Sequence, residues 1–497
     1  MGMFRTKSIE QTIKDTEAPE HRLRRRLSAL DLTVFGVGVI VGTGIFVLTG
    51  RVARDTAGPA VALSFVVAAV ACGLAALCYA EFASTVPVAG SAYTFAYATL
   101  GEFPAWIIGW DLILELALGA AVVSVGWSGY FASLMATLGV HLPPGLAGEG
   151  AVFNLPAMLI VLLLTVVLVA GIKLSSRTNL VLVTVKVAVV LLVIFAGLFF
   201  IDSRNYTPFI PPAEATQSVE GLGAPLIQVL FGLTPTAYGI AGVFSAAAVV
   251  FFAFIGFDIV ATAAEETKNP QRDMPIGILG SLAVCTALYV GVSLVVVGMQ
   301  PYQRLSSAAP LADAFRAVGQ PWLATVISIG AIAGLTTVVL IMMLGQSRVF
   351  FAMSRDSLLP RSLAAVHPKY GTPARITVII GLVTAVLAGF IPLSALAELV
   401  NIGTLFAFVI VSIAVVLLRR TRPELPRPFR TPLVPLVPIL SVLASAYLMV
   451  NLPVETWLRF LAWMAVGVVV YFLYGRRHSH LARPPEPAQG DARRPVG

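Results

Sequence analysis

Long apolar stretches, separated by short polar or glycine- and proline-rich connections, dominate the chain of 497 residues. A helix needs about 20 mostly apolar residues to cross a bilayer core about 30 Å thick. Twelve stretches, numbered here in chain order as spans 1 to 12, meet this pattern: 31–50, 60–84, 102–135, 153–172, 178–201, 243–264, 275–298, 322–352, 374–391, 395–418, 433–451 and 457–475. The pattern predicts an all-α polytopic membrane protein with twelve transmembrane helices and no soluble domain.

The composition agrees with this prediction. Hydrophobic residues make up 58% of the chain and charged residues only 12%, whereas a typical soluble domain is roughly 25% charged. The mean hydropathy of +0.90 excludes a cytosolic enzyme, a disulfide scaffold and a disordered regulator. The cysteines Cys72, Cys78 and Cys285 lie inside apolar runs, so we expect neither a disulfide framework nor a metal site.

The positions of the basic residues predict the topology. With a cytoplasmic N-terminus, 26 of the 33 Lys and Arg residues fall on the cytoplasmic side, six fall outside, and Lys186 lies within span 5. This asymmetry follows the positive-inside rule and explains the net charge of +8 without a nucleic acid partner. No signal peptide is recognisable. We therefore expect a multi-pass protein of the cell membrane with a cytoplasmic N-tail (1–30) and a cytoplasmic, disordered C-tail (476–497).

Two spans contain residues that disfavour a continuous helix. Span 1 places four glycines within residues 36–44, and span 6 follows an apolar run with Gly256 and Asp258. Close packing of a glycine-rich helix face is one interpretation of span 1. The other is a helix break, which has to line a polar cavity because free backbone groups facing lipid would each cost several kcal/mol.

The positions of these candidate breaks predict an inverted repeat. They fall in the first and sixth spans of a chain whose first ten spans divide evenly, as in a five-plus-five inverted repeat. The predicted units are a first repeat (31–201, spans 1–5), an external loop (202–242) with room for a short helix, a second repeat (243–418, spans 6–10), and spans 11 and 12 (419–475).

Broken helices expose N–H groups at one half-helix and C=O groups at the other, which matches the two charges of an amino acid zwitterion. We expect the substrate carboxylate to accept hydrogen bonds from the N–H groups of Thr43 and Gly44. The substrate ammonium would donate to the carbonyls of Ile40, Phe252 and Ile255.

Several segments together resemble a known family, the amino acid–polyamine–organocation (APC) transporters, and within it the bacterial relatives of the cationic amino acid transporters. They are GVIVGTGIFVLTG in span 1, GWDLILELALG and VGWSGYF in span 3, FFAFIGFDIVATAAEETKNPQRDMP from span 6 onward, and MMLGQSRVFFAMSRDSLLP at the end of span 8. The resemblance covers residues 22–475. It implies the LeuT-like fold, with discontinuous spans 1 and 6 and the substrate held between spans 1, 3, 6, 8 and 10.

The resemblance also implies site residues. The substrate backbone would contact Ile40, Gly42, Thr43, Gly44, Phe252, Ala253 and Ile255, and the aromatic gate over the substrate would be Phe252. The segment SRDSLLP departs from the family at Ser357, where the family usually has Gly. This position lies in a predicted cytoplasmic loop and leaves the pocket assignment unchanged.

Lys186 lies too deep in span 5 to reach either membrane face. Burial disfavours the charged form of lysine, so this amine could load and release a proton; a structural ion pair is the alternative. In related folds this corner holds a sodium ion between spans 1 and 8, and a lysine ammonium can occupy the same place. We expect it to donate to carbonyls near Gly38 and Val41. The hydroxyl of Thr336 or Thr337 would accept a further hydrogen bond, and proton coupling would replace sodium coupling.

The acids have different expected roles. Glu115 in span 3 is expected to face the interior, where it could pair with Lys186, relay its proton or hold a helix contact. Asp258 is expected to order the unwound segment or its gate by accepting N–H bonds, and Asp111 to be structural. Solvated or loop-pairing roles are expected for the acids at predicted cytoplasmic helix ends, Glu81, Glu265 and Glu266. Membrane-interface anchoring is expected for Trp106 and Trp457.

These features predict a secondary transporter that imports an L-amino acid by proton symport. Alternating access would come from spans 1, 2, 6 and 7 rocking against spans 3, 4, 5, 8, 9 and 10. The segment 330–335 offers no acid for a cationic side chain, and Leu335 would fill space beside a small neutral amino acid such as alanine. Arginine or lysine transport and amino acid exchange are alternatives. No Walker motif or catalytic triad is found, so we expect no nucleotide partner and no cofactor; an intramembrane enzyme is the weaker alternative.

Overall fold

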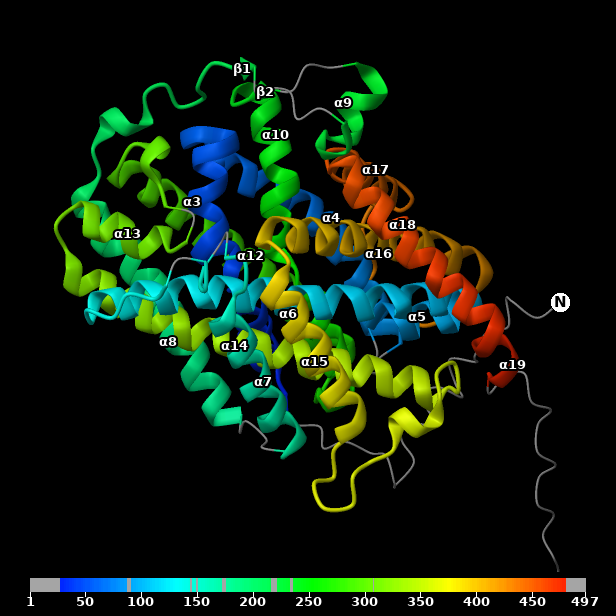
Figure 1. Cartoon of the computed structure of the whole chain (residues 1–497). Helices are drawn as coiled ribbons and strands as arrows, with labels where there is room; N and C mark the ends of the chain where they lie inside the picture. Colours follow the sequence, from blue (N-terminus) through cyan, green and yellow to red (C-terminus); the bar gives the residue numbers. More distant parts are fainter. Residues whose placement is uncertain are drawn as a thin grey trace, which may run out of the picture.

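The computed structural model describes residues 27–86, 91–143, 145–148, 151–171, 176–215, 221–232, 236–306 and 308–479. This part of the chain is mainly helical (Figure 1). It contains eight helical stretches long and apolar enough to cross a membrane: Gly44–Thr85, Glu102–Thr137, Leu180–Phe200, Gly239–Ala264, Pro270–Met299, Pro321–Arg355, Leu393–Thr421 and Val454–His478. Four shorter apolar helices accompany them: α2 (Ala29–Ile40), α7 (Leu155–Val169), α15 (Ala374–Phe390) and α17 (Leu436–Val450).

Long apolar sequences form these helices because a helix satisfies its backbone hydrogen bonds internally, which lipid requires. The long helices are α4 (Val61–Thr85), α6 (Glu102–Thr137), α8 (Ser176–Gly197), α12 (Pro270–Met299), α14 (Pro321–Arg355), α16 (Leu393–Thr421) and α18 (Val454–Val470). Shorter helices are α3 (Thr49–Val52), α5 (Ser91–Thr99), α9 (Leu226–Phe231), α10 (Gly239–Val250), α11 (Phe257–Val260), α13 (Pro310–Ala317) and α19 (Arg476–His478). The predicted tail residues before 27 and after 479 lie outside the described residues.

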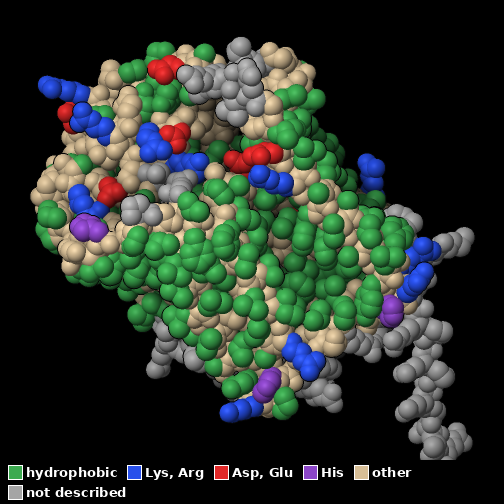
Figure 2. All heavy atoms as spheres, in the orientation of Figure 1, with side chains coloured by type: hydrophobic (Ala, Val, Ile, Leu, Met, Phe, Trp, Pro, Cys, Tyr) green, Lys and Arg blue, Asp and Glu red, His purple; other side chains and the backbone are tan. Residues whose placement is uncertain are grey.

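Helix α6 runs through the middle of the molecule and packs along α14 and α16, while α12 packs against α4 and α2, and α15 against α7 (Figure 1). Figure 2 shows a broad hydrophobic surface across one face, with charged side chains gathered toward its edges. Soluble monomers rarely expose hydrophobic side chains across a whole face in this way. The protein is therefore a multi-pass membrane protein, as the sequence predicted.

The predicted connection between spans 1 and 2 (51–59) differs from the expected loop. It is itself helical, and the chain passes through a wide helical turn at Ala53–Ala57 and a tight one at Gly58–Ala60 before α4 begins. Gly58 has a φ of 64°, a left-handed conformation that glycine adopts without steric cost. The second part of span 1 and the whole of span 2 thus form one continuous helical stretch, Gly44–Thr85.

The predicted external loop contains the short strands β1 (Glu214–Ala215) and β2 (Thr236–Ala237), which pair antiparallel. The same segment contains α9, and this is a short helix of the kind that the sequence left room for. The N–H of Leu226 in α9 donates to the carbonyl of Leu452, 3.0 Å away. Helix α9 therefore packs on the connection between α17 and α18.

Glu81 is buried rather than solvated. It is 2% exposed, and its carboxylate accepts hydrogen bonds from Nε and Nη2 of Arg419 at 2.9 and 2.7 Å and from the N–H of Thr431 at 2.8 Å. Of the two roles expected for this acid, the paired one is observed. The forked guanidinium geometry suits such a two-point contact with a carboxylate, which joins α4 to the end of α16 and the segment after it.

The side chain of Trp106 packs inside the protein and does not face outward, as the predicted role of a membrane-interface anchor requires. Its side chain is fully buried, and Nε1 donates to the carbonyl of Gly467 in α18 at 2.8 Å. Trp110 stacks between Trp106 and Trp463, so three indoles join α6 to α18. The burial depends on where α18 packs, which the local sequence around Trp106 does not reveal.

The departure from the family pattern at Ser357 falls where α14 ends. Ser357 has a φ of 62°, and its N–H donates to the carbonyl of Ser354 at 3.0 Å. Glycine is the usual residue in such a left-handed helix terminus because it has no Cβ to clash. The structure thus gives a physical reason for the Gly that the family usually has here.

Candidate functional site

The first predicted span is interrupted in the middle of its glycine-rich segment. Helix α2 ends at Ile40, and Val41 takes an extended conformation with a ψ of 92°. Helical structure resumes at Gly44 with one wide turn, Gly44–Leu48, followed by α3. Gly42 and Thr43 thus lie between two helical segments, and both are buried.

The sixth predicted span is interrupted in a similar way. Helix α10 passes into a tight turn at Phe251–Phe254, Ile255 is extended, and α11 begins at Phe257. Gly256 has a φ of 122°, and a Cβ at this position would lie 2.7 Å from Cγ1 of Val39. Glycine is therefore required here both by conformation and by the closeness of span 1.

The two interruptions are in direct contact. A Cβ on Gly44 would lie 2.3 Å from Cα of Ala253, so glycine allows the two backbones to meet. The hydroxyl of Tyr289 in α12 lies 2.7 Å from the carbonyl of Ile40 and 2.7 Å from the carbonyl of Ala253. One hydroxyl thus bridges the end of α2 and the unwound part of span 6, donating its single proton to either carbonyl.

The predicted substrate-contact residues gather around this junction. Phe252, Ala253 and Ile255 are all at most 4% exposed. Gly42 faces Val338 of α14, where a Cβ would meet Cγ1 at 3.5 Å, and Leu335 lies one helical turn before Val338. The hydroxyl of Thr43 is buried and has no hydrogen-bond partner among the described residues. A buried hydroxyl without a partner is costly, and here it marks a place where a polar ligand would be favourable.

Lys186 of α8 reaches the end of α2. Its ammonium donates to the carbonyl of Gly38, to the carbonyl of Val41 at 3.3 Å and to Oγ1 of Thr337 at 3.4 Å. The side chain is fully buried. Of the two hydroxyls considered from the sequence, Thr337 is the partner. Thr336 instead accepts a hydrogen bond from Nε1 of Trp127 at 3.0 Å.

Glu115 does not pair with Lys186. The hydrogen bonds of Lys186 within the described chain all go to carbonyl and hydroxyl oxygens, and neither carboxyl oxygen of Glu115 has a partner there. The hydroxyl of Thr404 faces Glu115 but donates its proton to the carbonyl of Val400. Neither residue therefore forms an ion pair within the part of the chain that the structure describes.

Asp111 and Asp258 lie in the same buried region as Glu115. The carboxyl of Asp111 packs on Gly403 of α16, where a Cβ would lie 2.6 Å from Oδ1. Backbone groups of Gly256, Asp258 and Ile259 hydrogen-bond to the Asp258 carboxyl. These hydrogen bonds lie at the start of α11, next to the interruption. Of the two remaining acids, Glu266 is partly exposed with Arg348 3.9 Å away, and the side chain of Glu265 lies outside the described part.

Comparison with known proteins gives the family. Residues 27–472 match the family model described as amino acid permease. The chain belongs to the amino acid permease family, within the APC superfamily. It is 51% identical to the branched-chain amino acid permease BcaP of Bacillus subtilis (strain 168), over 97% of this chain and 99% of that protein.

Two further relatives have names that indicate other substrates. The permease is 48% identical to the methylthioribose transporter of Bacillus subtilis (strain 168), again over 97% of this chain and 99% of the relative. It is 38% identical to cationic amino acid transporter 1 of Arabidopsis thaliana, over 84% of this chain and 67% of that protein. The permease is thus a transporter and not an enzyme, but the names of its relatives do not agree on one substrate.

Sequence reasoning missed Tyr289 as a residue of the permease's candidate site. A signal was available, because a tyrosine in the middle of the otherwise apolar span 7 needs a partner for its hydroxyl when it is buried. The partners could not be identified, since Ile40 and Ala253 lie 249 and 36 residues away along the chain.

Proposed function

We propose that this permease imports small neutral L-amino acids, such as alanine, by proton symport. The observation that carries the proposal is the direct contact of two helix interruptions, one in span 1 and one in span 6, beside the unpartnered hydroxyl of Thr43. The N–H groups of Thr43 and Gly44 would bind the substrate carboxylate. The substrate ammonium would bind carbonyls of span 6, and it would compete with the hydroxyl of Tyr289 for the carbonyl of Ile40.

The proposed architecture has twelve spans. Helix α2 and the start of Gly44–Thr85 form span 1, the rest of that stretch forms span 2, and α7, α15 and α17 cross the membrane alongside the other seven long stretches. Spans 1–5 and 6–10 form the inverted repeat, and both termini lie in the cytoplasm of a cell-membrane protein. Under this arrangement the bundle of spans 1, 2, 6 and 7 rocks against the other spans of the repeats. Tyr289 of span 7 supports this grouping, because it holds the interruptions of spans 1 and 6 together.

Proton coupling is assigned to Lys186, with Glu115 as a second proton carrier. Lys186 of the scaffold contacts the end of α2 in the moving bundle, so a change in its charge alters the contact between the two parts. Loss of the proton would remove the attraction between the ammonium and two carbonyls at the negative end of a helix. In this way protonation of one side chain would favour one position of the bundle.

A neutral substrate agrees with the residues around the junction. Leu335 and Val338 of α14 supply apolar surface next to Gly42. Neither offers the charge that an arginine or lysine side chain would need when removed from water. The branched-chain permease that matches at 51% identity supports a neutral substrate. A methylthioribose substrate is less favoured, because it has neither charge of the zwitterion that the two interruptions match.

The test is uptake of labelled L-alanine into proteoliposomes that contain the purified permease and have an acidic exterior. We expect accumulation that a protonophore abolishes. Unlabelled valine, leucine or isoleucine should inhibit this uptake, each according to how well its side chain fits the space beside Leu335 and Val338. Inhibition by arginine and lysine alone would overturn the neutral-substrate assignment, and inhibition by methylthioribose alone would overturn amino acid transport. Uptake only into vesicles preloaded with amino acid would identify an exchanger.

A further inference from the structure

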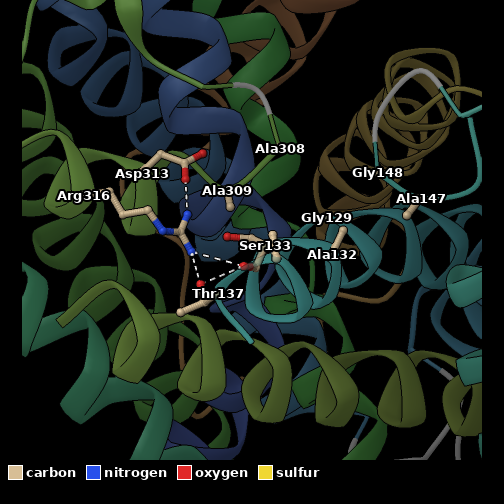
Figure 3. A pocket seen from close by; sticks show the side chains of 11 residues that line it. Gly129, Ala132, Ser133, Thr137, Ala147, Gly148, Ala308, Ala309, Asp313 and Arg316 are labelled. Atoms are coloured by element: carbon tan, nitrogen blue, oxygen red, sulfur yellow. Dashed lines mark hydrogen bonds and ion pairs between the residues drawn. The ribbon is translucent and has the colours of Figure 1, made fainter. Parts of the chain in front are cut away.

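A separate cavity of about 580 Å³ lies at the end of α6, against α13 (Figure 3). Its walls come from the last two turns of α6, from Ala147 and Gly148, and from the segment Ala308 to Arg316. The volume falls within the roughly 300–1,000 Å³ of typical small-molecule pockets. Because this end of span 3 is the one proposed to face outward, the cavity would open to the cell exterior.

Two opposite charges lie side by side in this cavity. Asp313 and Arg316 are three residues apart on α13 and form an ion pair, with each side chain about one third exposed at 33% and 31%. Nη2 of Arg316 also donates to Oγ1 of Thr137 at 3.1 Å and to the carbonyl of Ser133 at 3.3 Å. Figure 3 shows the Arg316 side chain reaching from α13 to the end of α6. The guanidinium is thus held in place while water can still reach it.

The remaining wall is small and apolar, apart from a further hydroxyl. Gly129, Ala132, Ala136 and Ala309 line it and carry at most a methyl group, so no side chain fills the space. The Oγ of Ser133 is buried and has no partner among the described residues. The site therefore supplies a fixed cation and a carboxylate beside a shallow apolar floor, with the Ser133 hydroxyl buried beneath it.

This combination selects between classes of ligand. A simple anion would meet the carboxylate of Asp313, and a metal cation would meet the guanidinium of Arg316, so each would gain one attraction and suffer one repulsion. A small zwitterion can place its carboxylate near Arg316 and its ammonium near Asp313. The absence of larger side chains on the floor favours a small group on its α-carbon.

We propose that this cavity is a second, external binding site for a small amino acid, distinct from the central junction. The inference rests on the proposed function, and it adds a place where substrate collects before it enters. The two sites are close along α6. Gly126 packs on Thr43 of the central site, where a Cβ would meet Oγ1 at 2.9 Å, and Gly129 lines the cavity. Three residues of helix separate them by about 4.5 Å.

The test is equilibrium binding of labelled L-alanine to the full chain in lipid nanodiscs. At saturation we expect the wild-type protein to bind about twice as much alanine as Arg316→Gln, which loses the cation. Ala132→Trp fills the cavity without changing the ion pair, and it should give the same reduction. Propionate and ethylamine, which each carry one of the two charges, should compete poorly for the site.

Arg459→Gln is the matched control. Arg459 also forms an ion pair on its own helix with an acid, Glu455, at 2.9 Å, but it does not line the cavity. This variant should bind as much alanine as the wild type. Equal binding by wild type, Arg316→Gln and Ala132→Trp, together with normal uptake by the wild type, would overturn the external site alone. Absence of both binding and uptake in the wild type would instead overturn the proposed function.

Discussion

Lys186 and Glu115 are two ionisable side chains buried in the apolar interior of this permease, and the protein treats them differently. Lys186 is fully buried and Glu115 is 3% exposed. The ammonium of Lys186 has three oxygen partners, which equals the number of protons it can donate. The carboxyl of Glu115 has no hydrogen-bond partner in the described part of the chain.

The difference shows which of the two sites is built for a charge. Carbonyls at the end of α2 carry the negative end of the helix dipole and offset the cost of burying a cation. The carboxyl of Glu115 receives no such compensation from hydrogen-bond donors in the described part of the chain. The surroundings of Lys186 therefore suit a cation in this conformation, whereas those of Glu115 provide no equivalent set of donors for an anion.

The largest expected effect is that of Lys186→Ala. It should abolish alanine accumulation driven by a pH gradient, because it removes the group whose charge joins α8 to the end of α2. The measurement is uptake into proteoliposomes with and without an acidic exterior, and exchange without a gradient reports whether the variant still binds substrate. Normal accumulation under the gradient would contradict the assignment of coupling to this lysine.

A smaller but still large effect is expected for Glu115→Gln. The amide has nearly the shape of the neutral acid, so the variant should fold and exchange alanine but accumulate less under a gradient. Asp111→Asn is the matched control, since Asp111 lies one turn away on α6 and is assigned a structural role. Equal loss of gradient-driven uptake in both variants would show that Glu115 has no role in proton coupling that Asp111 lacks.

The sequence identified Lys186 readily because it is the single Lys or Arg far from both ends of an apolar span, whereas Arg348, Arg375 and Arg459 lie close to the ends of theirs. It did not decide between Thr336 and Thr337, because neighbours on a helix point about 100° apart and the orientation of α14 is set by packing. The pairing of Glu81 was harder still to predict. Its partner Arg419 lies 338 residues away, so only the tertiary structure shows that this acid is paired rather than solvated.

The two helix interruptions show the same division between local and distant information. Gly256 has a φ that favours glycine, and the glycine in the sequence indicated the break. The two breaks were expected to bind one substrate together from the inverted-repeat layout and from the resemblance to a transporter family, because nothing in either segment alone points to the contact of Gly44 with Ala253. The position of each helix break is thus predictable from residue type, but the contact between the two breaks in the folded protein is not.

The Tyr289→Phe variant tests the role of a neutral hydrogen-bond donor at the end of α2, the same helix end that the Lys186 cation contacts. The hydroxyl binds the carbonyl of Ile40, close to the carbonyls that Lys186 binds. Removing it should lower the free energy of unfolding by about 1–2 kcal/mol, because two buried carbonyls lose a shared donor. Alanine uptake should fall but stay proton-driven, measured beside thermal denaturation. A loss of proton dependence would assign to Tyr289 the coupling role that is here assigned to Lys186.

The finest test is Thr337→Val, which removes one of the three oxygens around Lys186 and leaves both carbonyls in place. A hydrogen bond to a charged group contributes about 1.5–3 kcal/mol, and the 3.4 Å distance places this one at or below the lower limit. We expect gradient-driven uptake to fall by up to about tenfold, with its pH dependence shifted, because the charged amine is less well stabilised. Thr336→Val removes the adjacent hydroxyl, which binds Trp127 instead of the lysine, and should leave the pH dependence unchanged. If both variants shift the pH dependence equally, the effect comes from the packing of α14 and not from the oxygens around the ammonium.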